Sequence, residues 1–294
     1  MYNYKALHYP DGTSEIRFYS CPVGNGNASR NSRKEIVTTE NPFTGQQMPV
    51  ETLPASMEEY DRKREHSLLT SRNRTKNKIF SLARCNRWDW FFTITFDPAL
   101  VDRYSYDDCS RKVSDWLSNL RKLDPYIQYL IVPEQHKDGA WHFHGLINHS
   151  PALCMTYSGK DTRRGVPIYN IGRYRFGYTT ATHVQSSEAV SRYITKYITK
   201  ELVSVSSGRK RYWASRNLKE PAEETCFLHP DDVKKLVADY MLVCTRSHVV
   251  ELPFCLRLDT NKDELLYNAT IRYITIPSEC LQVPEDMRIG GFSA

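Results

Sequence analysis

The sequence lacks any long apolar run. None of its 294 residues lies in a stretch near the roughly 18 consecutive apolar residues that a membrane-spanning helix needs, and its longest apolar strings are about as short as residues 129–132. The first residues, 1–5, also lack the apolar segment of a secretory signal. We therefore expect a cytoplasmic protein with no membrane partner.

Paired cysteines are also missing. The chain has eight cysteines, but no two are separated by the two-residue spacing that zinc ribbons and thioredoxin-like redox sites use. This spacing argues against both classes. Without a secretory signal, we expect these cysteines to be reduced thiols.

Charge is unevenly distributed. The formal net charge is +6, and hydrophobic residues make up 40% of the chain, enough for a buried core. Residues 61–90 hold nine Lys or Arg against three Asp or Glu, and residues 190–220 hold eight against two. Residues 221–294 are acidic, with seven basic and twelve acidic residues. The two basic segments fit contact with a nucleic-acid backbone, and they equally fit solvated helix faces.

The pattern of elements predicts an α+β fold, with a central antiparallel sheet flanked by helices. We expect an N-terminal extension over residues 1–60, a core domain over 61–215 and a C-terminal α+β extension over 216–294. Periodicity and turn signals predict helices at 57–86, 105–123 and 188–203, a buried strand at 91–96, and hairpin strands at 126–135 and 140–148.

The hairpin carries two histidines in alternation. His142 and His144 share one face of a strand because side chains alternate between faces. If pairing is symmetric about Asp138, Glu134 lies opposite His142 and shares that face. Two imidazoles and one carboxylate can hold a divalent cation such as Mg²⁺ or Mn²⁺. His136 has the same parity and is a rival third ligand, and two histidines bonded on a polar face are the simpler alternative.

A tetrapeptide is written twice at residues 193–200, as Tyr-Ile-Thr-Lys-Tyr-Ile-Thr-Lys. Apolar residues every four positions, from residue 190 to residue 202, favour one amphipathic helix. On such a helix Tyr193 and Tyr197 lie one turn apart, with Lys196 and Lys200 on or near the same edge. The two phenols are candidate nucleophiles for phosphate, and two packing tyrosines are the alternative.

Together these segments resemble a known family. Phe-Thr-Ile-Thr-Phe at 92–96, Trp-His-Phe-His-Gly at 141–145 and the tandem tyrosine segment resemble motifs I, II and III of the HUH endonucleases. They are similar, more narrowly, to the two-tyrosine class of rolling-circle replication initiators (Rep proteins) of single-stranded DNA phages and plasmids. The resemblance covers residues 90–202 and carries the HUH, ferredoxin-like palm as the expected sheet.

The resemblance implies residue roles. His142 and His144 match the motif II metal ligands, and Glu134 fits the acidic ligand that precedes them. Tyr193 and Tyr197 match the nucleophiles, and Lys196 and Lys200 match the lysines that follow them. Two further predictions concern DNA contacts: the motif I strand places Thr93 and Thr95 toward DNA, and the loop residues Arg173, Tyr174 and Arg175 interleave base-stacking rings with phosphate-binding arginines.

The implied activity is metal-dependent transesterification of single-stranded origin DNA. One tyrosine forms a 5′-phosphotyrosine and frees a 3′-OH for a host polymerase, and the second tyrosine ends the round by rejoining the strand. The sequence contains no Gly-x-x-x-x-Gly-Lys-Ser/Thr motif, so unwinding would depend on a host helicase. For a phage-borne gene, the location would be the host cytoplasm.

Three alternatives stay open. One is an HUH transposase or mobilisation relaxase, which would differ in its DNA product. Another is a single-stranded DNA-binding protein without catalysis, which would form no covalent species. The third is a hydrolase of small phosphate esters, which would make little use of the basic segments.

Overall fold

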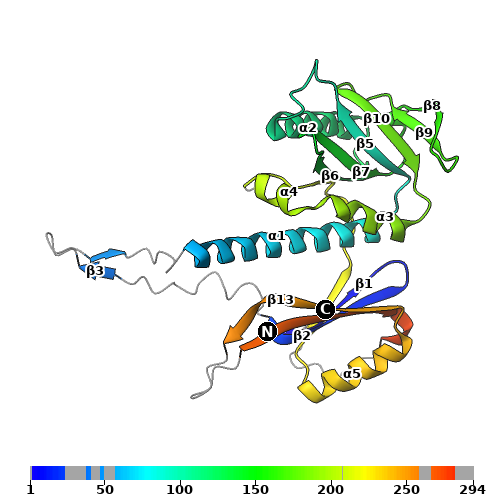
Figure 1. The fold of residues 1–294 in the computed structure, drawn as a ribbon. Helices are drawn as coiled ribbons and strands as arrows, with labels where there is room; N and C mark the ends of the chain where they lie inside the picture. Colours follow the sequence, from blue (N-terminus) through cyan, green and yellow to red (C-terminus); the bar gives the residue numbers. More distant parts are fainter. Residues whose placement is uncertain are drawn as a thin grey trace. The chain divides into compact units, whose positions relative to one another are not determined.

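The computed structural model describes residues 2–23, 38–40, 47–49, 57–206, 208–257 and 266–281. The chain forms two compact units, which we call the central unit (residues 67–220) and the terminal unit (residues 1–66 with 221–294). Each unit contains an antiparallel sheet accompanied by helices, so the predicted α+β class is confirmed (Figure 1). No helix in the described ranges is long and apolar enough to cross a membrane.

The central unit is built on a seven-stranded sheet with the strand order β11-β6-β7-β5-β10-β9-β8. The strands are β5 (Trp90–Phe96), β6 (Tyr129–Gln135), β7 (Trp141–Ile147), β8 (Met155–Asp161), β9 (Pro167–Ile171), β10 (Gly177–His183) and β11 (Trp213–Ala214). The predicted motif I strand and both hairpin strands match β5, β6 and β7 to within three residues. The motif I strand therefore lies directly beside the histidine strand, with β10 on its other side.

Helix α2 (Tyr106–Leu123) covers one face of this sheet. The helix begins at Ser105, whose hydroxyl accepts a hydrogen bond from the backbone N–H of Asp108. On the sheet, the Phe92 ring meets Trp116 at 5.9 Å between ring centroids. Because even-numbered residues of β5 face α2, its odd-numbered residues point to the opposite face. Helix α1 (Met57–Cys85), the predicted basic helix, adds apolar side chains from its last two turns to the same core.

The tandem tyrosine segment is not one continuous helix, which corrects the prediction for residues 188–203. Helix α3 (Ser187–Ile194) is followed by a 3₁₀ turn (Thr195–Tyr197), and α4 (Lys200–Val205) begins after a break at Ile198. Thr199 caps α4, with its hydroxyl accepting from the backbone N–H of Leu202. The repeated Ile-Thr pairs lower helix propensity and supply this cap, which explains the break. The apolar positions are nevertheless buried as expected: Val190, Ile194, Ile198 and Leu202.

The terminal unit joins both ends of the chain in one sheet. Its strand order is β12-β1-β2-β14-β13, and its helix is α5 (Pro230–Val243). The strands are β1 (Tyr2–His8), β2 (Thr13–Val23), β12 (Ala222–Cys226), β13 (Arg246–Arg257) and β14 (Leu266–Pro277), and a separate pair is formed by β3 (Thr38–Glu40) and β4 (Gln47–Pro49). Phe18 of β2 and Tyr240 of α5 belong to its core. No sequence pattern indicated that the two ends pair, and the domain boundaries at 60 and 215 stay a prediction.

Candidate active site

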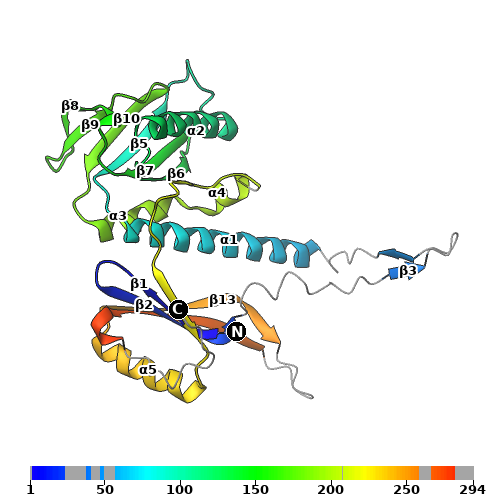
Figure 2. The ribbon, with the colours of Figure 1, turned by 180° about the vertical axis from the view of Figure 1, so that it is seen from behind.

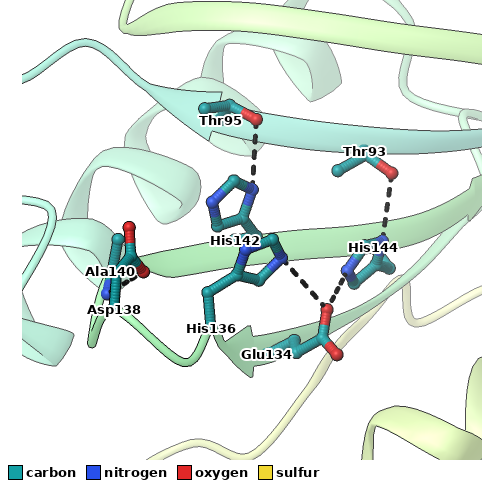
Figure 3. A network of polar contacts seen from close by, with 8 residues as sticks. All are labelled: Thr93, Thr95, Glu134, His136, Asp138, Ala140, His142 and His144. Atoms are coloured by element: carbon teal, nitrogen blue, oxygen red, sulfur yellow. Dashed lines mark hydrogen bonds and ion pairs between the residues drawn. The ribbon is translucent and has the colours of Figure 1, made fainter.

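The β6–β7 hairpin places three candidate ligands together. Glu134 is the direct cross-strand partner of His142, as the symmetry about Asp138 predicted. His144 lies two residues further along β7, and its Nε2 donates to Glu134 Oε2 at 2.7 Å. The carboxylate thus lies within reach of the histidine face of the sheet (Figure 3).

His136 joins this cluster. Its Nε2 lies 3.6 Å from Glu134 Oε2, and its ring stacks on His142 with 3.7 Å between ring centroids. Figure 3 shows the Glu134 carboxylate between the rings of His136 and His144. The parity argument that made His136 a rival ligand is therefore consistent with its position.

Thr93 and Thr95 lie opposite the histidines on β5. Thr93 Oγ1 is 3.0 Å from His144 Nδ1, and Thr95 Oγ1 is 3.1 Å from His142 Nδ1. A hydroxyl can donate or accept, so each threonine satisfies either tautomer of its imidazole and fixes the ring orientation. The structure therefore gives these threonines a direct partner within the protein, where the sequence had suggested contact with DNA.

Burial keeps both imidazoles neutral. It lowers the pKa of His142 to about 4, with a smaller contribution from His136 and His144 in their charged forms. Burial also lowers the pKa of His144, although the Glu134 carboxylate opposes the effect. At neutral pH both rings therefore carry a free lone pair, which is the form that binds metals.

The donor set fits a divalent cation by its chemistry. Neutral imidazole nitrogens and a carboxylate oxygen are ligands that Mn²⁺ accepts, and the two threonines supply the hydrogen bonds that orient such histidines. Within the described part of the chain, no three His, Cys, Asp or Glu side chains are already arranged to hold an ion. Glu134, His142 and His144 therefore remain the predicted ligands, held in place by the two strands.

The two tyrosines meet beside this cluster. The Tyr197 ring stacks on His144, with 3.8 Å between centroids and 8° between planes. The Tyr193 ring contacts Tyr197 edge-on at 5.6 Å and also meets Phe91 at 5.3 Å. The break in the helix therefore keeps the two phenols adjacent. Sequence reasoning missed Phe91, although its parity with Thr93 could have placed it on this face.

The tyrosines differ in their surroundings. Tyr197 is 9% exposed, whereas Tyr193 is 43% exposed. Burial, together with a hydrogen bond and charge repulsion from Tyr193, raises the pKa of the Tyr197 phenol above its usual value. The buried phenol therefore needs a positive charge beside it before it can ionise at neutral pH.

The predicted lysines and loop residues fare differently. Lys196 Nζ lies 5.0 Å from the centroid of the Tyr193 ring, and the side chain of Lys200 lies outside the described residues. Arg173 and Arg175 are exposed. Tyr174 is 5% exposed and packs against Phe96 and Trp116, which contradicts the expectation that its ring stacks on bases.

Comparison with known proteins identifies the same region. Residues 89–202 match a family model of replication-associated proteins of the ORF2 type. This part of the chain, from β5 through the tandem tyrosines, is thus similar to Rep-type replication-associated proteins. Neither the curated proteins nor the solved structures gave a match to this chain.

Proposed function

We propose that the chain is a replication initiator of the two-tyrosine HUH class, which nicks and rejoins single-stranded origin DNA through a 5′-phosphotyrosine. One observation carries this proposal most directly: the Tyr197 ring lies flat against His144, whose Nε2 contacts Glu134. A candidate nucleophile is thereby in contact with the candidate metal ligands. The family match supports a role in DNA replication.

The reaction is a balanced exchange of ester bonds. A tyrosine oxygen forms a bond to phosphorus while the bond from phosphorus to the 3′ oxygen breaks, and the phenol proton is lost as the 3′-OH gains one. The number of phosphodiester-type bonds is unchanged, so neither cutting nor joining needs ATP. The second tyrosine then cuts the regenerated origin, and the released 3′-OH attacks the first phosphotyrosine to close the circle.

The chain's own residues would hold and orient the reacting groups. A divalent cation bound by Glu134, His142 and His144 would supply positive charge at the scissile phosphate and beside the buried phenol. The stacking of Tyr197 on His144 fixes the direction from which this phenol approaches. Lys196, beside the Tyr193 ring, places an ammonium group near the more exposed phenol.

Covalent capture tests this proposal even where the origin sequence is not known. The purified protein is incubated with a random pool of single-stranded DNA and Mn²⁺, and noncovalent complexes are then removed by boiling in detergent. We expect a retained DNA adduct that EDTA prevents and that mass spectrometry assigns to Tyr193 or Tyr197. Sequencing the captured strands would identify the cut site.

The same experiment separates the alternatives. Tight binding with no adduct on any strand would contradict the nuclease and favour a non-catalytic single-stranded DNA-binding protein. An adduct followed by transfer to an unrelated strand, with no closed circles, would favour a transposase or relaxase. Closed single-stranded circles from a circular template carrying two captured sites would support the initiator.

A further inference from the structure

A cleft lies on the central unit beside the active site. It has a volume of ≈ 400 Å³ and is formed by the β8–β9 turn and the end of β10. Pockets of about 300–1,000 Å³ accommodate small organic ligands, so a single nucleotide fits within this range. The residues that matter for its chemistry are Thr162, Arg163, Arg164, Thr182, His183 and Gln185.

The β8–β9 turn presents two arginines at the mouth of the cleft. The Thr162 backbone N–H donates to the Val166 carbonyl at 2.8 Å, and the Val166 N–H donates to Thr162 Oγ1 at 3.0 Å. Gly165 has a φ of +74°, a conformation that favours glycine and closes the turn. Arg163 and Arg164 are both exposed, and neither forms an ion pair with any residue that the structure describes.

The cleft is connected to the active site through the β5–β10 ladder. Thr182, in the cleft wall, is the cross-strand partner of Phe91 and shares its face of the sheet. Phe91 in turn lies 6.2 Å from the His144 ring and 5.3 Å from the Tyr193 ring, measured between centroids. The cleft and the tyrosines are therefore separated by a single side chain.

The sheet face between them is open. Thr180 lies opposite Thr93, and Tyr178 lies opposite Thr95, so β10 continues the face that carries the histidines. Tyr178 is 69% exposed. In both views, β8 and β9 lie at the edge of the sheet away from α2 and α4 (Figures 1 and 2).

We propose that this cleft binds one nucleotide of the single-stranded substrate close to the scissile phosphate. Arg163 and Arg164 bind its phosphate, since guanidinium groups pair with phosphate oxygens through two parallel hydrogen bonds. The polar edges of Thr182, His183 and Gln185 face the remainder of the nucleotide. The inference rests on the proposed function and specifies where the DNA strand leaves the catalytic face.

The test compares two pairs of exposed arginines on one hairpin. R163A/R164A removes the cleft charges, and R173A/R175A removes the same charge from the β9–β10 turn at the opposite end of β9. Binding of a fluorescein-labelled oligo(dT) strand of about 20 nucleotides is followed by anisotropy at several salt concentrations. We expect R163A/R164A to weaken binding by about 10- to 100-fold and to reduce the salt slope by about 0.7 to 1.4, corresponding to one or two lost phosphate contacts.

R163K/R164K is the conservative variant. Lysine keeps the charge but cannot form the two parallel hydrogen bonds, so the salt slope should return while part of the affinity stays lost. At saturating DNA, the rate of covalent adduct formation by R163A/R164A should remain close to wild type, because these side chains hold the strand and do not touch the reacting atoms.

The outcomes are distinguishable. Equal weakening by both alanine pairs, or none by R163A/R164A, overturns the cleft assignment even if the wild type binds and cuts DNA. A wild-type protein that binds no single-stranded DNA overturns the proposed function itself. Loss confined to R163A/R164A, with restoration of the salt slope by lysine, supports the inference.

Discussion

The two sheets of this protein differ in what they leave uncovered. In the terminal unit, α5 packs on one face, and the charges of the other face neutralise each other. Arg17 pairs with Glu15 at 2.7 Å, and Lys5 pairs with Glu223 at 2.6 Å. In the central unit, the face opposite α2 brings together neutral histidines, a carboxylate and two phenols. At its edge lie the two cleft arginines, which form no ion pair with the described residues.

The comparison shows that a similar architecture can serve two purposes. Paired charges on a sheet satisfy one another and leave little to attract an anion. Ligands that are held in place but not neutralised leave chemical capacity unused by the fold itself. We therefore expect substitutions in the two units to affect DNA cleavage very differently.

The largest effect is expected at the tyrosines. Y193F/Y197F removes both nucleophilic oxygens while keeping the rings that pack on His144 and Phe91. Adduct formation should be abolished, and binding of single-stranded DNA should be unchanged. Each single variant, Y193F and Y197F, should still form one adduct but no closed circles, as seen on a denaturing gel. An adduct in the double variant would contradict the assignment.

The next largest effect is expected at the histidines. H142A and H144A each remove one predicted ligand, and a lost cation forfeits several kcal/mol of charge stabilisation at phosphorus. Cleavage in Mn²⁺ should fall by at least about 100-fold, since each 1.36 kcal/mol corresponds to a factor of ten. Rates are measured by adduct formation in a single turnover. Undiminished cleavage at saturating Mn²⁺ would refute the ligand role.

A smaller effect is expected at the threonines that bond the histidines. T93V keeps the shape of the side chain but removes the hydroxyl from His144 Nδ1. Loss of such a partner typically costs about 10- to 100-fold in metal affinity. Mn²⁺ binding is measured by calorimetry on the full chain. T93S, which keeps the hydroxyl, is the matched control, and equal weakening by both variants would indicate a packing role instead.

The smallest effect is expected on the terminal sheet. H248A removes an exposed ring that stacks on Tyr273 at 4.7 Å, on the face where the neighbouring charges are paired. Binding of single-stranded DNA should change by less than about twofold, whereas loss of a ring that stacks on a base costs roughly 1–3 kcal/mol. A loss of that larger size, measured by anisotropy, would make the terminal sheet a second strand-binding surface.

The sequence predicted the catalytic hairpin well because its geometry is local. A glycine-containing turn and strict alternation suffice to place Glu134 opposite His142. The break at Ile198 could not be foreseen, because spacing by four fits both a continuous helix and two short helices with a tight turn between them. Burial of Tyr174 was missed because a loop ring's direction depends on packing against Phe96 and Trp116, which lie far away in sequence.

The terminal unit escaped prediction for a different physical reason. Its neighbouring strands come from opposite ends of the chain, as when Ile16 pairs with Ile274. No short-range pattern encodes such a pairing, because each strand alone shows only an alternation that several partners could satisfy. The 3.6-residue and two-residue periods identify elements, but they do not identify which distant elements meet.

This pairing of the chain's two ends also sets an order of assembly during synthesis. Every strand of the central sheet has been made once residue 220 has been added, whereas the terminal sheet still lacks β12, β13 and β14. At about 5–20 residues per second, a ribosome needs roughly 3 to 11 s to extend the chain from residue 221 to residue 277. During that interval the β1–β2 hairpin has two unpaired edges, which makes it the part of the nascent chain most open to pairing with another strand.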